Sequence, residues 1–290
     1  MTQQTIKKAI IPVAGYGTRF LPATKAQPKE MLPVVDKPVI QYIVEAAVAA
    51  GITQIIIVTS GNKRAVEDHF DRTPELEKWL EKAKKNKILE EIRQIPRMAN
   101  FIYIRQKGAP GNGTPVLNAK SLIGNEPFAV FYGDEFYTGQ TSWIKQMIQV
   151  YEKYQDPVVA LAEVTKEETK RYGIFSGKEV EKNVWQVNSI IEKPGPKKAK
   201  SNLANIGGYI LTPDIFPILE KLKPGKGDEV WLADAVKILN QKRPIYGRKI
   251  DGKLYDAGTI IGWLKANVEL TLADDSINQE FAKYLRHLKY

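Results

Sequence analysis

The stretch KAIIPVAGYGTRFLPATKAQPKEMLP, residues 8–33, decides how this chain folds. It opens with an apolar run, Ala9 to Val13, that has the length of a buried β-strand. A turn containing Gly15 and Gly17 follows at once, and glycine lets a backbone turn tightly and bring its N–H groups close to a ligand. A buried strand that ends in such a turn predicts an α/β sheet with a ligand site at its edge.

The residues after the turn suit an anion with many oxygens. Thr18 adds a hydroxyl, and three cations follow within a short distance, namely Arg19, Lys25 and Lys29. Backbone N–H groups flanked by several cations favour a polyphosphate. Phe20 stands where the dinucleotide fingerprint needs a third glycine, and no Gly-Lys-Ser/Thr follows, so neither common phosphate loop is present. A plain strand-to-helix turn with solvated charges remains the alternative.

Length and composition limit the class of protein. A chain of 290 residues with 43% hydrophobic and 26% charged residues predicts one large globular α/β domain, residues 1–290. Without cysteine there is no disulfide, thiol nucleophile or cysteine-bound metal, and with two histidines a histidine-rich metal site is nearly excluded. No apolar run reaches the roughly 18 residues of a membrane-spanning helix. Residues 1–4 lead into a strand without a signal peptide, so we expect a cytoplasmic protein.

The formal net charge of +10 is compatible with nucleic acid, an anionic membrane or small polyanionic substrates. The lysines are scattered, however, and do not alternate with aromatic residues as a nucleic-acid platform requires. We therefore expect small anionic ligands, and neither a nucleic acid nor a membrane as partner.

Hydrophobic periodicity predicts the order of the elements. An amphipathic helix from Pro38 to Gly51 lies between the first strand and a second buried strand, residues 54–59, which indicates a βαβ unit and a parallel sheet. Further predicted elements are a charged helical excursion at 74–95, strands at 101–105, 125–132 and 158–164, a helix at 143–154, an antiparallel pair at 171–176 and 184–191, and helices from about 259 to 290. The fold class is α/β, with a mixed, mostly parallel central sheet flanked by helices. The C-terminal helices would cover the core or pair with another subunit.

Two further groups of residues lie at predicted strand ends. Gln106 opens a second glycine-rich loop, and its amide offers one donor and one acceptor group to the edge of a nucleobase. Asp134 follows a buried strand, at the edge where both loops are expected, and a carboxylate there is a ligand for a hard cation. A helix-capping aspartate is the alternative for Asp134.

Three motifs, GYGTRFLP at 15–22, PKEMLP at 28–33 and DKP at 36–38, resemble the signature of the sugar-1-phosphate nucleotidylyltransferases. Within this family the chain is most similar to the bacterial UTP–glucose-1-phosphate uridylyltransferases. The resemblance implies the Rossmann-like nucleotide-diphospho-sugar transferase fold and a homodimer or homotetramer. It also implies a Mg²⁺-dependent reaction of UTP with α-D-glucose 1-phosphate that yields UDP-glucose and pyrophosphate.

The resemblance also assigns roles to residues. It implies catalytic roles for Arg19 and Lys29 and magnesium ligation by Asp134 and Asp256. The nucleotide is expected to bind at Ala14, Gly15, Gly17, Thr18, Gln106 and Gly111. The sugar phosphate is expected to bind at Gly173, Glu192, Lys193 and Asn205.

At two places the chain departs from this family. It has GNGTP at 111–115, where similar members carry GLGHA, and Gly208 where an arginine is expected. These departures leave two alternatives open: a related nucleotidylyltransferase with another base or sugar, for example dTTP, and a weakly active regulatory paralogue that binds sugar nucleotides.

Overall fold

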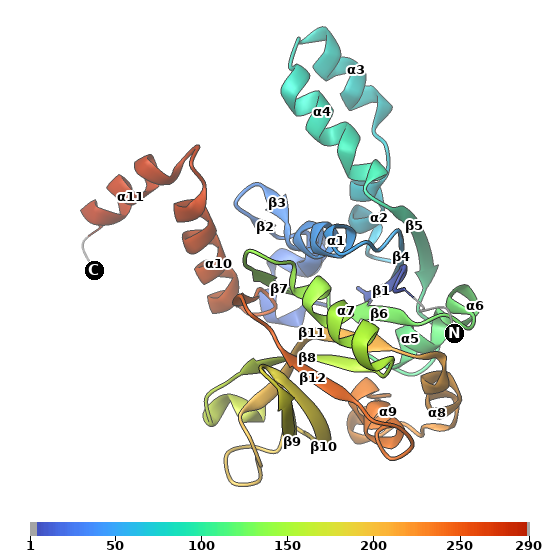
Figure 1. Cartoon of the computed structure of the whole chain (residues 1–290). Helices are drawn as coiled ribbons and strands as arrows, with labels where there is room; N and C mark the ends of the chain where they lie inside the picture. The colour runs from blue at the N-terminus through green and yellow to red at the C-terminus, as the bar shows by residue number, and fades with distance from the viewer. Residues whose placement is uncertain (1–4, 289–290) are drawn as a thin grey trace.

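A nine-stranded sheet forms the centre of the computed structural model, which describes residues 5–288 apart from the side chain of Lys226 (Figure 1). Its strand order is β5-β4-β1-β6-β11-β8-β12-β10-β9. The strands are β1 (Lys8–Pro12), β4 (Gln54–Thr59), β5 (Asn100–Arg105), β6 (Phe128–Phe131), β8 (Val158–Glu163), β9 (Gly173–Glu181), β10 (Val184–Glu192), β11 (Leu203–Leu211) and β12 (Tyr246–Lys249).

The mixed α/β sheet is confirmed, but the expectation that it is mostly parallel is wrong. In the described part of the chain, β5, β4, β1 and β6 pair in parallel, as do β8 and β12, whereas the other four neighbouring pairs in the order are antiparallel. The predicted antiparallel pair is β9 with β10. The two residues that connect β9 to β10 permit only an antiparallel pair.

Helices cover both faces of the sheet and form two hydrophobic cores. One core contains residues of α1 (Val39–Ala49), α2 (Arg64–Phe70) and α7 (Trp143–Tyr154), and the other residues of α5 (Thr114–Asn118), α6 (Lys120–Ile123), α8 (Phe216–Lys221) and α9 (Leu232–Leu239). Within β1, Ile11 faces the first core and Ile10 the second. This burial on both faces explains why the strand reads as a continuous apolar run.

Two helical hairpins extend from the body (Figure 1). The charged excursion folds as α3 (Pro74–Lys82) and α4 (Asn86–Gln94), and the C-terminal segment folds as α10 (Ile260–Ala273) and α11 (Asn278–His287). No residue of α11 is buried, and Ala266 is the buried residue of α10. Within residues 5–288, no helix is long and apolar enough to cross a membrane.

Two short ribbons complete the fold. In one, β2 (Pro33–Val34) pairs with β3 (Lys37–Pro38). In the other, β7 (Glu135–Thr138) pairs antiparallel with β13 (Lys253–Asp256), and the register places Asp256 opposite Glu135. This pairing brings the segment after β6 next to the segment before α10, which are far apart in the sequence.

Candidate active site

The glycine turn connects β1 to a short 3₁₀-helix, η1 (Thr18–Phe20). Gly17 has φ of 66°, in the left-handed region that favours glycine, and its carbonyl accepts the Thr24 hydroxyl proton at 2.7 Å. A Cβ built on Gly17 would lie 3.3 Å from the Cβ of Lys29. The turn therefore lies directly against Lys29, while Gly15 and Thr18 are exposed at the edge of the sheet.

The two predicted metal carboxylates converge on one glycine. A Cβ built on Gly258 would overlap Asp134 Oδ2 and lie 3.2 Å from Asp256 Oδ1. Asp256 Oδ1 also accepts the N–H of Gly258, at 3.1 Å. The absence of a side chain at Gly258 thus keeps a small space between two carboxylates that come from different parts of the sequence.

Three cations surround this pair of carboxylates. Lys29, at the start of η3 (Lys29–Met31), forms an ion pair with Asp134, and Arg171 forms one with Asp256. Arg19 Nη1 donates to the Gly258 carbonyl at 3.3 Å. Burial acts to lower the pKa of Lys29, but Asp134 and Glu30 raise it above its ordinary value, so this lysine stays charged.

Glu135 adds a third carboxylate at the same place. Its Oε2 accepts the N–H of Gly207 at 2.6 Å. Burial, followed by repulsion from Asp134 and Asp256, raises the pKa of Glu135 to about 8. The repulsion that Asp134 and Asp256 exert on the Glu135 carboxylate marks a place that attracts cations.

The residues present fit a magnesium ion. Carboxylate oxygens are hard ligands, and Mg²⁺ in nucleotide-binding sites is typically held by one or two carboxylates together with substrate phosphates. Asp134 and Asp256 provide such a pair, and a Cβ at Gly258 would fill the space between them. Across residues 5–288, no group of three or more His, Cys, Asp and Glu side chains forms a metal site of protein ligands alone.

The predicted sugar-phosphate residues lie at the adjacent ends of β9 and β10. Gly173 pairs with Glu192 in the sheet, and a Cβ on Gly173 would come 2.9 Å from Glu192 Oε2. Lys193 has φ of 45°, which L side chains rarely adopt, and its Nζ lies 3.3 Å from Glu192 Oε1 and 4.3 Å from the centroid of the Trp231 ring. Burial raises the pKa of Glu192, while Lys193 lowers it.

The second glycine-rich loop follows β5, two strands from β1 in the parallel part of the sheet. The Gln106 N–H donates to the Thr59 carbonyl at 2.9 Å, which continues the pairing of β5 with β4. Gly111 has φ of 112°, and a Cβ there would overlap the backbone of Val230. Close packing against the segment before α9 therefore explains the glycine at 111.

Asn205, the remaining predicted sugar-binding residue, is buried in the sheet. It lies inside β11 with 7% of its surface exposed, and its amide donates to the carbonyls of Ala160 and Gly208 at 3.0 and 3.1 Å. These bonds span an irregularity in the pairing of β11 with β8. Both donors of the Asn205 amide are thus used within the sheet, and its sugar-binding role stays a prediction. The glycine at 208 is explained by the close pairing of β11 with β6, since a Cβ there would overlap the Val130 carbonyl.

Sequence reasoning missed four residues that organise the site. Tyr172 and Arg171 both contact Asp256. Glu30 and Lys63 form an ion pair of 2.9 Å with side chains only 1% and 2% exposed. Glu30 lies inside the PKEMLP motif and Tyr172 directly precedes Gly173, so both stand next to residues that the sequence had singled out. Their partners, Lys63 and Asp256, are remote in the sequence, and no local pattern could indicate these contacts.

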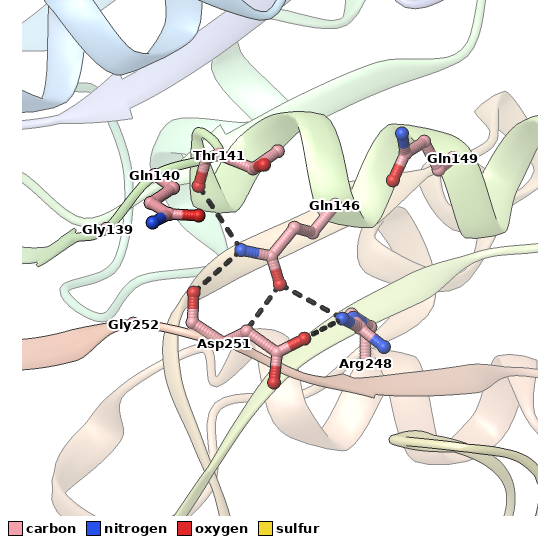
Figure 2. Close-up of a pocket in the computed structure, with 8 residues that line it drawn as sticks. All are labelled: Gly139, Gln140, Thr141, Gln146, Gln149, Arg248, Asp251 and Gly252. Atoms are coloured by element: carbon pink, nitrogen blue, oxygen red, sulfur yellow. Dashed lines mark hydrogen bonds and ion pairs between the residues drawn. The ribbon is translucent and has the colours of Figure 1, made fainter.

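A separate cavity of about 440 Å³ lies beyond the other ends of β7 and β13 (Figure 2). Its lining consists of Gly139, Gln140, Thr141, Gln146, Gln149, Arg248, Asp251 and Gly252. Gln146 Nε2 donates to the carbonyls of Thr141 and Asp251, and its Oε1 accepts from Arg248 and from the N–H of Asp251 (Figure 2). None of the predicted site residues lines this cavity, so it is distinct from the carboxylate site.

Residues 8–272 match the family model described as nucleotidyl transferase. The match covers the glycine turn and both converging aspartates. The chain belongs to this family.

Within this family, the chain is similar to individual proteins that are named for UDP-glucose synthesis. The UTP–glucose-1-phosphate uridylyltransferase of Staphylococcus haemolyticus strain JCSC1435 is 48% identical over 285 residues, which are 98% of this chain and 99% of that protein. A UDP-glucose pyrophosphorylase crystallised with UDP-glucose superposes with a TM-score of 0.86 at 44% identity, covering 93% of this chain and 100% of that one. A UTP-bound UGPase from Acinetobacter baumannii gives a TM-score of 0.90 at 37% identity, covering 98% and 100%.

Proposed function

We propose that this protein transfers a uridylyl group from UTP to α-D-glucose 1-phosphate, which yields UDP-glucose and pyrophosphate. The observation that carries the proposal is the convergence of Asp134 and Asp256 on Gly258, next to the glycine turn and its cations. The curated relatives that match nearly the whole chain carry the name of this activity.

The central physical problem of this reaction is repulsion between its two substrates. Two like charges 4 Å apart repel by about 4 kcal/mol at an effective dielectric constant near 20, and several such pairs form when two phosphates meet. The reaction needs cations and positioning more than a nucleophilic side chain, because the sugar phosphate itself attacks the α-phosphorus in line. The cations around the carboxylates suit this requirement.

The nucleotide half of the site is assigned to the glycine turn and the loop after β5. Backbone groups from Ala14 to Thr18, together with Arg19, hold the leaving β- and γ-phosphates. Lys29 neutralises the charge that grows at the α-phosphate, and its raised pKa keeps it protonated. Gln106 and the backbone of Gly111 read the base.

The sugar half is assigned to the ends of β9 and β10. Glu192 accepts hydrogen bonds from sugar hydroxyls, and the backbone at Gly173 allows the ring to approach. Lys193 anchors the attacking phosphate. Asp134 and Asp256 would hold Mg²⁺, which when bound supplies Lewis-acid polarisation and a template for the two phosphates.

A matrix of initial rates tests this proposal. Pyrophosphate release is measured for UTP, dTTP, CTP, ATP and GTP, each with several sugar 1-phosphates, in Mg²⁺ and in EDTA. We expect the highest kcat/KM for UTP with glucose 1-phosphate and no turnover in EDTA. A preference for dTTP would mean that the enzyme's nucleotide substrate is dTTP and not UTP. Background rates with every substrate pair would overturn the enzymatic proposal in favour of a regulatory sugar-nucleotide binder.

We further propose that residues 1–290 form one nucleotidyltransferase domain that acts in the cytoplasm as a homodimer or homotetramer. Apolar side chains lie exposed at Ile261, Leu264, Val268 and Leu272, which share one face of α10. No described residue of α11 is buried, and this helix extends away from the sheet (Figure 1). A second subunit would cover this surface.

A further inference from the structure

The two halves of the proposed site are joined through one residue, Tyr172, at the junction between the end of the 165–172 segment and β9. Its backbone carbonyl accepts the N–H of Lys193 at 3.2 Å. Its hydroxyl donates to Asp256 Oδ2 at 2.8 Å. A single residue thus links the two, because its backbone bonds the residue assigned to the attacking phosphate and its side chain bonds a carboxylate assigned to the metal.

The contacts of Asp256 are divided between its two oxygens. Oδ2 accepts from Tyr172 and from Arg171, whereas Oδ1 accepts the N–H of Gly258 and lies on the side of Asp134. Because Oδ2 is held by two donors, the carboxylate cannot rotate freely about its last bond. Oδ1 is thereby kept facing the space at Gly258.

Tyr172 is better suited to this task than Arg171. The aromatic ring packs against a small apolar cluster formed by Ile174, Ala204 and Ile206, which fixes the position of the hydroxyl. The Arg171 side chain is long and 44% exposed, so its guanidinium is held less firmly. It also lies over the Tyr172 ring, 5.0 Å from the centroid, and so depends on the tyrosine for its own placement.

We propose that Tyr172 is a positioning residue that holds Asp256 at a fixed place and orientation relative to Lys193. It thereby sets the distance between the divalent cation and the attacking sugar phosphate. This inference rests on the proposed roles of Asp256 and Lys193. Partners that orient a metal-binding carboxylate typically change metal affinity by about 10- to 100-fold when removed.

Tyr172→Phe tests the proposal because it removes the hydroxyl and keeps the ring. Mn²⁺ serves as the probe, titrated by electron paramagnetic resonance in the presence of saturating UDP-glucose and without pyrophosphate, so that no turnover occurs. We expect Mn²⁺ binding about 10-fold weaker than in the wild type. In steady-state assays we expect kcat to fall while the KM for UTP stays within about twofold, since the nucleotide half of the site is untouched.

Two comparison variants make the outcome decisive. Tyr154→Phe is the matched control, because the Tyr154 hydroxyl also donates to a carboxylate, that of Glu181, which lies at the end of β9 remote from Gly173. Asp256→Asn tests the metal site itself. If Asp256→Asn binds Mn²⁺ as the wild type does, the metal assignment fails. If Asp256→Asn binds Mn²⁺ weakly while Tyr172→Phe binds it normally, the metal site stands and the positioning role is overturned.

Stability is the second readout. A melting temperature for Tyr172→Phe far below that of Tyr154→Phe would also overturn the positioning role, since the Tyr172 hydroxyl would then be structural.

Discussion

At the scale of single residues, the site depends on a glycine, Gly258, because any side chain at this position would meet Asp134 and Asp256. Gly258 is buried, and its carbonyl accepts from Arg19 while its N–H donates to Asp256. The backbone at this position therefore contacts both Arg19, proposed to bind phosphate, and Asp256, proposed to bind the metal. Any atom added at Cα would enter the space that the two aspartates share.

Gly258→Ala should abolish most activity while the fold is retained. The new methyl group would overlap Asp134 Oδ2 and push the carboxylates apart, and a displacement of about 1 Å can lower a rate by about 10²-fold. We expect kcat to fall at least that much. Gly61→Ala is the control, since nothing lies within 4 Å of a Cβ at that glycine. Wild-type rates for Gly258→Ala would place the reaction elsewhere.

Glu135 predicts a dependence of stability on pH. Its pKa is raised from an ordinary value of 4.5 to about 8 in the folded protein, so the folded state binds a proton that the unfolded chain releases above pH 4.5. The contribution of this group to stability is therefore complete below about pH 4.5 and is lost as the pH rises through about 8. Urea unfolding of the wild type in EDTA should show this decline. Glu135→Gln, which mimics the protonated form, should flatten the curve over the same window. Parallel curves for the two proteins would contradict the assignment.

At the scale of elements, a buried ion pair connects the signature segment to the rest of the fold. Glu30 lies in η3 next to Lys29, and Lys63 precedes α2. The stem of Glu30 packs beneath Gly133, where a Cβ would come within 3.0 Å of Glu30 Cγ. Burial raises the pKa of Glu30 although Lys29 and Lys63 act to lower it. The Glu30–Lys63 ion pair thus fixes η3, which carries Lys29, next to Asp134.

Lys63→Met should destabilise the protein strongly. The change leaves the Glu30 carboxylate buried without its partner, and breaking such pairs typically lowers the free energy of unfolding by about 3–5 kcal/mol. Lys120→Met is the control, because the ion pair of Lys120 with Glu220 is about half exposed and should contribute less than about 1 kcal/mol. Denaturant unfolding measures both. Equal, small effects would mean that water reaches Glu30.

At the scale of the whole molecule, the exposed stripe on α10 predicts self-association. Replacing Ile261 and Leu264 together with aspartate puts two charges into the apolar face, and we expect the oligomer to dissociate to monomers in sedimentation velocity. Ile88→Asp, on the other projecting hairpin, is the control for a general effect of surface charge. A wild-type monomer, or an unchanged oligomer in the double variant, would contradict the proposal.

Much of the fold was predictable because its signals are local. The predicted strand at 54–59 and helix at 143–154 match β4 and α7 residue for residue. The glycine turn, the cations after it and the strand before Asp134 were also visible as contiguous patterns. The short strands β7 and β12, of four residues each, carried too little periodicity to predict.

By itself, the sequence determined the α/β class, the glycine turn and the chemistry that its residue types allow, because each depends on neighbours along the chain. The tertiary structure alone decided which side chains meet. The register of β7 with β13 brings Asp256 to Asp134, the pairing of β11 between β6 and β8 buries Asn205, and the packed ring of Tyr172 reaches Asp256. These contacts join residues far apart in sequence, and the pairing of strands, which no local pattern encodes, places them.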